Sequence, residues 1–414
     1  MTTFEEQIME GETILCIASR VWHSLWRSTQ QIMSRMAAQN RVLYLEPGRN
    51  PERSVFAEMI RNWPNFFALR AQKPHENLIL IPTPSSLPYA RRHLPRSVLQ
   101  ITTPLVAKIN ARILIRHVRW AMEAFDVEAP ILWLYSPRHL DLIGKFGEKL
   151  VCYFNYDEYP NFVGNERIKE LLRQFDDQLS SRADVILASG RAQWERRKKL
   201  NPNAYFIPNG VDFDLFHKAL DPETPTPSDV ASLKKPIIGF AGWLGYQIDV
   251  DLLLHVAGVY SNCSLVLVGP DEILKDARLH RLRAMPNVHF LGRKELRSLP
   301  QYLKTFDVAL IPYRLVGYTL TAYPLKLHEY LAAGRAIVAV ALPELEPYSH
   351  IVRIAETQDE FIHQVGKALE DYAPQAIKAR VAVARENTWD QRVAEIYRIL
   401  DYRLYGAEDR RIKG

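Results

Sequence analysis

Short apolar runs recur along the whole chain, and each is followed by a longer amphipathic stretch. An apolar run of this kind fits a strand that is buried on both faces, and an amphipathic stretch fits a helix that covers it. This alternation predicts parallel sheets with helices on both sides, the doubly wound α/β class. The expected strands are 13–19, 41–47, 78–82, 131–136, 150–155, 184–189 and 205–208 in the first half of the chain, and 237–241, 264–269, 288–292, 308–312, 336–340 and 351–355 in the second.

The chain is long enough for two domains, because 414 residues exceed what a single hydrophobic core usually supports. With 47% hydrophobic and 24% charged residues, it has the composition of an ordinary globular protein and enough apolar material for two cores. We expect two Rossmann-like domains. Together with the hexapeptide 207–212 discussed below, the pattern predicts that residues 1–208 and a C-terminal helix over 387–414 form the first domain, and residues 209–386 the second. The stretch 221–228, rich in Pro and Thr, is expected to be an exposed segment just after the boundary between the two domains.

The composition argues against exported, membrane-spanning and disulfide-bonded proteins. No run of 18 or more apolar residues occurs, and the N-terminus is rich in glutamate instead of carrying a basic and then apolar leader. The cysteines Cys16, Cys152 and Cys263 lie in or beside apolar runs, which favours reduced core residues over a disulfide or a metal cluster. We therefore expect a cytoplasmic protein without a bound metal.

The stretch 323–338 (YPLKLHEYLAAGRAIV) combines features of a nucleotide-binding turn. Pro324 is expected at the first helical position, and the free N–H groups behind it, with Lys326, would face a phosphate. Glu329 lies one turn further along, where its carboxylate can accept hydrogen bonds from a ribose diol, and Gly334 suits the left-handed end of the helix. A core helix is the alternative, because three apolar residues have the spacing of one buried face: Leu327, Tyr330 and Leu331.

This stretch resembles the donor-binding signature of GT-B glycosyltransferases, specifically the retaining family-four type that includes enzymes of polysaccharide and teichuronic-acid assembly. A second match, 207–212 (IPNGVD), is typical of the point where the first domain of that family gives way to the second. Segments 239–242, 267–270, 287–292 and 306–312 continue the resemblance in the family's order. It implies two Rossmann-like domains facing a central cleft, with the C-terminal helix crossing back to the first domain.

The resemblance also implies where a nucleoside diphosphate sugar would bind as the donor substrate, without a cofactor. Many relatives place an Arg and a Lys just beyond the turn 241–245, but this chain has Trp243, Tyr246 and Gln247 there. Many relatives also carry a Glu eight positions before the helix glutamate, and that residue here is Thr321. The expected donor contacts are Gly242, Trp243, Gly245, Gly269, Arg314, Thr321, Pro324, Leu325, Lys326 and Glu329.

The acceptor is expected on two turns of the first domain. In the turn 155–162, Asp157 and Glu158 would orient an acceptor hydroxyl and Tyr156 would stack on a sugar ring; alternatively, Asp157 caps a helix that starts near Pro160. In the turn 18–26, three residues are expected to face the acceptor: Arg20, Trp22 and His23. We place Asp157, Glu158 and His23 nearest to the reacting groups, in a mechanism that needs no side-chain nucleophile.

A basic, apolar stretch covers residues 77–122, where no Asp or Glu occurs among 46 residues and the net charge of +7 exceeds the +6 of the whole chain. Residues 99–125 have helical apolar spacing with one basic edge, which favours either a membrane surface or packing on the first domain. The alternative is an ordinary helix whose basic face is solvated and binds no partner. No RNA-binding or zinc motif accompanies the charge, so nucleic acid is not expected as a partner. The basic residues are Arg91, Arg92, Arg96, Lys108, Arg112, Arg116 and Arg119.

Together these features predict a retaining, metal-independent glycosyltransferase that moves a sugar from a nucleoside diphosphate to a hydroxyl of a glycan or lipid-linked glycan. It would work in the cytoplasm or at the inner face of the cell membrane. A non-catalytic nucleotide-sugar or glycolipid binding subunit with the same fold is the main alternative. An epimerase or a phosphorylase would share the two-domain cleft, but their acid, base or lysine groups are not identifiable in the sequence.

Overall fold

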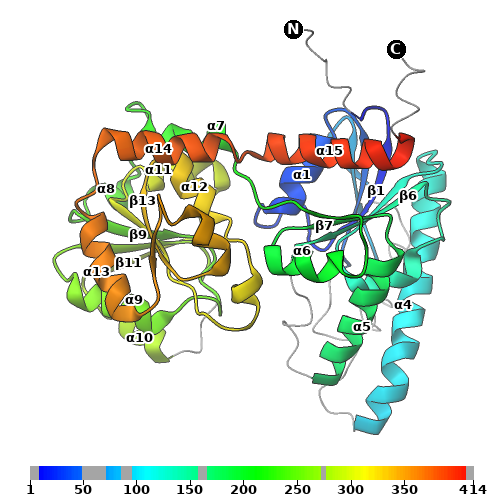
Figure 1. Cartoon of the computed structure of the whole chain (residues 1–414), viewed down its shortest axis with the longest axis horizontal. Helices are drawn as coiled ribbons and strands as arrows, with labels where there is room; N and C mark the ends of the chain where they lie inside the picture. Colours follow the sequence, from blue (N-terminus) through cyan, green and yellow to red (C-terminus); the bar gives the residue numbers. More distant parts are fainter. Residues whose placement is uncertain (1–8, 49–70, 85–95, 157–165, 272–276, 407–414) are drawn as a thin grey trace. The chain divides into compact units, whose positions relative to one another are not determined.

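The computed structural model describes residues 9–48, 71–84, 96–156, 166–271 and 277–406 (Figure 1). It divides into two units: unit 1 contains residues 1–207 and 393–414, and unit 2 contains residues 208–392. Each unit is an α/β structure with one mainly parallel sheet. Asp157, Glu158, Arg91 and Arg92 lie outside the described residues.

The sheet of unit 1 has eight strands in the order β3-β4-β2-β1-β5-β6-β7-β8, and all pairs except β3–β4 are parallel. The order reverses between β1 and β5, which makes their carboxyl ends the topological switch point of this sheet. Strand β3 was not predicted, because all four of its residues are exposed and it carries no apolar pattern. The strands are β1 (Thr13–Ile17), β2 (Arg41–Glu46), β3 (Gln72–His75), β4 (Leu78–Pro82), β5 (Ile131–Leu134), β6 (Leu150–Asn155), β7 (Val185–Ala188) and β8 (Ala204–Phe206).

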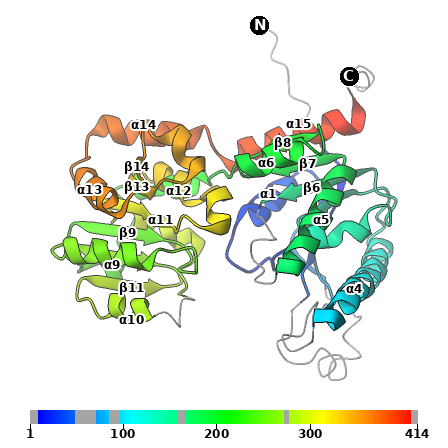
Figure 2. The same cartoon turned by 60° about the horizontal axis from the view of Figure 1, so that its bottom comes forward.

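The C-terminal helix α15 (Trp389–Tyr405) begins in unit 2 and continues in unit 1, as expected for the family. Its Tyr397 hydroxyl accepts a hydrogen bond from the Asn40 side-chain amide at 3.1 Å and donates to the Met36 carbonyl at 3.3 Å. These bonds fix the helix to unit 1. The other helices among the described residues of this unit are α1 (Ser28–Met36), α4 (Arg96–Ala124), η1 (Pro137–Leu142), α5 (Glu166–Arg182) and α6 (Arg191–Lys198). Helix α4 is the long cyan helix in Figures 1 and 2.

The sheet of unit 2 has six parallel strands in the order β11-β10-β9-β12-β13-β14. Its strands are β9 (Ile237–Ala241), β10 (Ser264–Val268), β11 (Val288–Gly292), β12 (Val308–Ile311), β13 (Ala336–Val340) and β14 (Arg353–Ala355). Helices lie on both faces of this sheet (Figure 1). One layer contains α9 (Val250–Val259), α10 (Ala277–Arg283) and α13 (Gln358–Ala368). The other contains α7 (Phe213–His217), α11 (Leu299–Leu303), α12 (Lys326–Ala332) and α14 (Pro374–Arg385).

Short helical elements complete unit 2: η3 (Lys218–Leu220), α8 (Ser228–Ala231), η4 (Leu296–Ser298), η5 (Gly317–Thr321) and η6 (Pro343–Tyr348). The Pro- and Thr-rich stretch 221–228 is largely exposed, as predicted. Lys304 holds it to the unit, because its ammonium donates to the carbonyls of Asp221, Pro222 and Thr224 at 2.6 to 3.0 Å.

The cysteines are free and buried, in agreement with the sequence. Among the residues that the structure describes, no cluster of His, Cys, Asp and Glu has the arrangement of a metal site. No helix in the described part of the chain is both long and apolar enough to cross a membrane.

Candidate functional site

Two glycine turns interlock at the carboxyl edge of the unit 2 sheet. Gly242 follows β9, and Gly269 follows β10 with a φ of +143°, which L side chains rarely adopt. A Cβ at Gly269 would lie 1.7 Å from the Gly242 carbonyl oxygen, and the Gly242 N–H donates to the Val268 carbonyl at 2.8 Å. Only glycine therefore permits this close approach.

Helix α12 brings an ion pair to the same edge. The Lys326 ammonium lies 2.7 Å from the Glu329 carboxylate, and the two side chains are only 16% and 14% exposed. The Lys326 Cε atom lies 3.0 Å from the point where a Gly242 side chain would begin, so the lysine crosses the first glycine turn. Glu329 is therefore neither sealed in the core nor freely solvated. A phosphate near Lys326 and a diol near Glu329 would both find charged partners here.

The ends of α12 differ in one respect from the prediction. Gly334 has a φ of +68° and ends the helix as expected. Pro324, however, is not the first helical residue: the helix begins at Lys326, after Leu325, because the Pro324 carbonyl accepts from Leu327 in a tight turn before the helix proper. Helix α12 has only seven residues, so we expect the charged side chains, and not the helix dipole, to attract a ligand here.

The core interpretation of α12 is confirmed for one face of the helix, and the other face carries the ion pair. Leu327, Tyr330 and Leu331 are fully buried. Tyr330 does more than fill space, because its hydroxyl accepts a hydrogen bond from the Ala241 N–H at 2.9 Å, directly before the Gly242 turn. This bond fixes the position of α12 along β9. The spacing of Tyr330 within the helix predicted that it is buried, but nothing in the sequence indicated its partner 89 positions away.

The loops after β9 and β12 form an aromatic surface. The Trp243 and Tyr246 rings meet edge to face at 5.3 Å, and the Tyr246 and Tyr318 rings lie 5.2 Å apart. Gly245 is enclosed by Trp243, whose ring would lie 2.5 Å from an added Cβ. The Gln247 side-chain amide donates to the Trp243 carbonyl at 2.6 Å, and the Arg314 N–H donates to the Gln247 carbonyl at 2.8 Å.

Thr321 and Arg314 are placed unequally for donor binding. The Thr321 hydroxyl donates to the Tyr318 carbonyl at 3.0 Å, so its proton is used within η5 and its oxygen is left as an acceptor. Arg314 is exposed on the loop after β12.

A separate pocket of about 140 Å³ lies at the carboxyl ends of β12, β13 and β14, and none of the expected donor contacts lines it. Its lining includes Asp249, Tyr313, Glu356 and Thr357.

The corresponding edge of unit 1 brings two of the predicted turns together. The Tyr156 hydroxyl lies 2.6 Å from the Ser19 hydroxyl, which joins the end of β6 to the end of β1. Arg20 is partly exposed and His23 is exposed. Trp22 was expected to face an acceptor, but it is only 5% exposed and packs edge to face on Tyr44 at 5.1 Å. Its ring therefore supports this edge from below.

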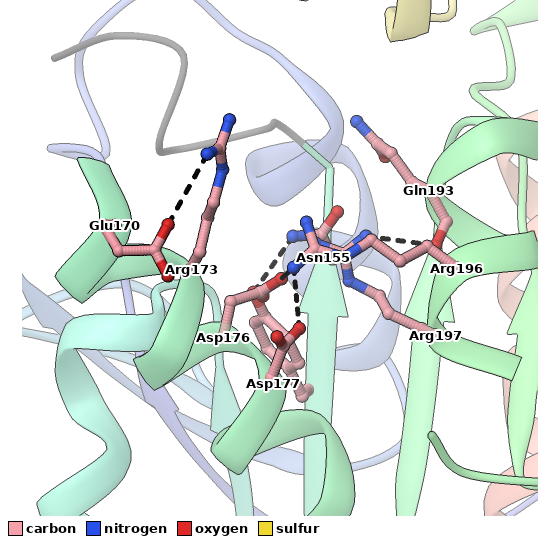
Figure 3. Close-up of polar contacts among 9 residues, drawn as sticks. Asn155, Glu170, Arg173, Asp176, Asp177, Gln193, Arg196 and Arg197 are labelled. Carbon is pink, nitrogen blue, oxygen red and sulfur yellow. Dashed lines mark hydrogen bonds and ion pairs between the residues drawn. The ribbon is translucent and has the colours of Figure 1, made fainter. Parts of the chain in front are cut away.

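A buried ion pair underlies the end of β6 (Figure 3). The Arg197 guanidinium donates to the Asp176 carboxylate at 2.7 Å, and the two side chains are 0% and 2% exposed. The other oxygen of Asp176 accepts from the Tyr153 hydroxyl at 2.6 Å, and that hydroxyl accepts from the Asn155 amide at 2.9 Å. The network thus connects α5 and α6 to the last residue of β6.

Sequence reasoning overlooked the turn after β5, which lies at the topological switch point of unit 1. Its His139 is half-buried, and burial, together with the adjacent Arg138 charge, lowers its pKa to about 4. His139 is therefore neutral at physiological pH. The Ser-Pro-Arg-His sequence directly after an apolar run was the available signal, because polar residues that follow parallel strands collect at one edge.

Part of unit 2 is similar to a known protein family. The family profile described as glycosyl transferases group 1 matches residues 235–371, which include both glycine turns and the Lys326–Glu329 pair. This part of the chain is similar to glycosyltransferase group 1 domains. The chain is also 26% identical over 231 residues to TuaH of Bacillus subtilis (strain 168). TuaH is named as a glycosyltransferase of teichuronic acid biosynthesis. That match covers 54% of this chain and 58% of TuaH.

Solved structures extend the likeness to almost the whole chain and establish the GT-B fold. Anabaena HepE, crystallised in complex with UDP and glucose, superposes with a TM-score of 0.60 at 14% identity and covers 95% of this chain and 100% of its own. The E. coli trehalose-6-phosphate enzyme bound with UDP-2-fluoro glucose gives a TM-score of 0.66 at 12% identity, over 95% and 99% of the two chains. At such identities the likeness establishes the fold alone.

Proposed function

We propose that the protein is a retaining glycosyltransferase that uses a nucleoside diphosphate sugar, with uridine as the favoured base. The Lys326–Glu329 pair across the Gly242 turn is the observation that carries the proposal, because it places a cation and a carboxylate together at the carboxyl edge of a group 1 domain. Lys326 would face the diphosphate, and Glu329 would bind the ribose. The UDP complexes of the structural neighbours support uridine.

The reaction would break the bond between the anomeric carbon and the diphosphate, and the new bond would form on the same face of the sugar. The acceptor hydroxyl would lose its proton to a donor phosphate oxygen, so no protein nucleophile is needed. The contribution of the protein is electrostatic: Lys326 would stabilise the charge that develops on the leaving diphosphate. Thr321 would accept one hydrogen bond from the sugar through its free lone pair.

A thermal-shift screen with UDP, GDP and ADP tests the donor assignment. A nucleotide at 100 times its Kd adds about 2.7 kcal/mol of stability to the folded state, which a melting curve detects easily. We expect UDP to raise the Tm and Lys326→Met to abolish that shift, while Lys378→Met, an exposed lysine of α14, should keep it. A chain that none of the three diphosphates stabilises would contradict the proposal.

A non-catalytic nucleotide-sugar binding subunit is the second candidate, because Thr321 replaces the family glutamate at the sugar. Both candidates predict UDP binding, so turnover must separate them. Release of UDP from a UDP-sugar in the presence of an acceptor, with the anomeric configuration of the product read by NMR, decides between them. A product with the donor's configuration supports the retaining enzyme, and donor binding without release supports the subunit.

For the acceptor we propose a glycan linked to a lipid, reached at an anionic membrane surface through α4. Lys108, Arg112, Arg116 and Arg119 lie on one face of this helix and are all exposed. Leu105 is 55% exposed on the same face, and Trp120 is 38% exposed at its border. Basic and apolar residues on one helix face suit a headgroup surface, with about 1 kcal/mol contributed by each basic residue.

Vesicle binding tests this surface. We expect Lys108→Gln, Arg112→Gln and Arg116→Gln together to reduce sedimentation with anionic vesicles; Arg119 is left in place because it donates to the Lys145 carbonyl. A triple variant at exposed basic residues elsewhere, Lys199→Gln, Arg281→Gln and Lys378→Gln, removes the same charge and should bind like the wild type. Equal losses in both triples would mean that only net charge matters.

A further inference from the structure

The hexapeptide 207–212 has no role in the proposed function, although it is one of the clearest motifs in the chain. The chain enters unit 2 within this hexapeptide, at residue 208. The hexapeptide pairs with residues 387–389, just before the chain leaves unit 2 at residue 392. The Val211 N–H donates to the Asn387 carbonyl, and the Trp389 N–H donates to the Val211 carbonyl, both at 3.0 Å. A Cβ at Gly210 would lie 2.8 Å from the Thr388 carbonyl carbon, so glycine is required for this pairing.

Asn209 connects the paired segments 207–212 and 387–389 to the proposed donor site. Its side-chain amide donates to the Tyr323 carbonyl at 2.8 Å, across 114 positions of the sequence. Asn209 is 8% exposed and Tyr323 is 6% exposed, so water does not compete for the bond. Tyr323 directly precedes Pro324 and lies three residues before Lys326. The bond therefore fixes the backbone at the point where it enters α12.

The Tyr323 side chain provides a second attachment. Its hydroxyl lies 2.7 Å from His328 Nε2 and 2.7 Å from the Tyr348 hydroxyl. His328 belongs to α12, lies between Lys326 and Glu329 in the sequence, and is fully buried. Burial is the main cause that lowers its pKa to about 3, and the charge of Arg392 is the second cause. Its Nδ1 atom has no hydrogen-bond partner among the described residues, so the proton of the neutral ring belongs on Nε2, which donates to Tyr323.

We infer that Asn209 and the Tyr323 hydroxyl are positioning residues for the donor site. Neither touches the proposed nucleotide; both fix the entry to α12 and, through it, the Lys326–Glu329 pair. A helix of seven residues cannot hold its own orientation, because short helices are stable only through tertiary contacts. The inference rests on the proposed function, since it names the residues that set the geometry of that same site.

Donor affinity in paired variants tests the inference. Asn209→Ala removes the amide bond, and Tyr323→Phe removes only the hydroxyl and keeps the ring. Their controls make similar losses elsewhere in unit 2: Asn287→Ala loses a side-chain amide that donates to the Ala257 carbonyl at 3.0 Å, and Tyr302→Phe loses a hydroxyl bonded to Asp229 at 3.2 Å. Each Kd for UDP is measured by calorimetry well below the Tm of that variant.

We expect both test variants to bind UDP about tenfold more weakly, the equivalent of roughly one buried hydrogen bond, while both controls stay within about twofold of the wild type. In the wild type, UDP should also slow amide hydrogen exchange in the peptide around 208–211, and Asn209→Ala should lose that protection. Test variants with a lower Tm and an unchanged Kd would show a merely structural role and overturn the inference. A wild type that binds no nucleotide would instead overturn the proposed function, and the inference with it.

Discussion

Replacing Glu329 by alanine gives the sharpest test of the donor site, provided that the ligand is varied along with the protein. The Glu329 side chain is 14% exposed, so a hydrogen bond from a ribose hydroxyl to its carboxylate forms in a largely desolvated place. Such a charge-assisted bond contributes about 1.5 to 3 kcal/mol, which corresponds to a Kd ratio of roughly 10 to 150. The variant also frees Lys326 from its 2.7 Å partner, and this changes the affinity for the diphosphate in its own way.

A comparison of UDP with 2′,3′-dideoxy-UDP separates the two effects, because both ligands carry the same diphosphate. We expect the wild type to prefer UDP by the ratio given above, and Glu329→Ala to bind both ligands with nearly equal Kd. Calorimetric titration at one fixed salt concentration measures all four constants. Glu346→Ala, at an exposed position of η6, serves as the control and should keep the wild-type ratio. A Glu329→Ala protein that still prefers UDP as strongly as the wild type would refute the ribose assignment.

Three further variants test the packing that positions these sites, each by urea or thermal unfolding. Gly269→Ala should destabilise the protein by about 1 to 3 kcal/mol or more through backbone strain, whereas Gly292→Ala, with a φ of +67° and no atom within 4 Å of the added Cβ, should cost less; equal losses would contradict the interlocked turns. Arg197→Met should cost about 3 to 5 kcal/mol because it leaves the Asp176 charge buried, and Arg173→Met, from an exposed pair with Glu170, should cost under about 1 kcal/mol. His328→Gln should flatten the acid side of the stability profile: below a pKa near 6.5 the unfolded chain binds a proton that the buried ring refuses, so stability falls as the pH decreases, by about 2 kcal/mol from pH 7 to pH 5. An unchanged slope in that variant would mean that His328 is not the group responsible.

Local patterns in the sequence were enough to predict the helices and strands and several of the charged residues at the candidate site. Apolar runs predicted all strands of both sheets except β3, because a strand buried on both faces must be apolar along its length. Lys326 and Glu329 were predicted to lie one turn apart on one short helix, and the left-handed Gly334 was predicted from its place after that helix. Such features depend on neighbours a few residues apart, and the chain order alone specifies those neighbours.

Tertiary structure decided which distant groups meet. The bonds from Tyr330 to Ala241 and from Asn209 to Tyr323 join residues 89 and 114 positions apart, and nothing in the residue types marks them as partners. Trp22 looked like an accessible aromatic residue until packing against Tyr44 buried it. Contacts of this kind arise from how helices and strands settle against one another, and many sequences with the same local periods would make different ones.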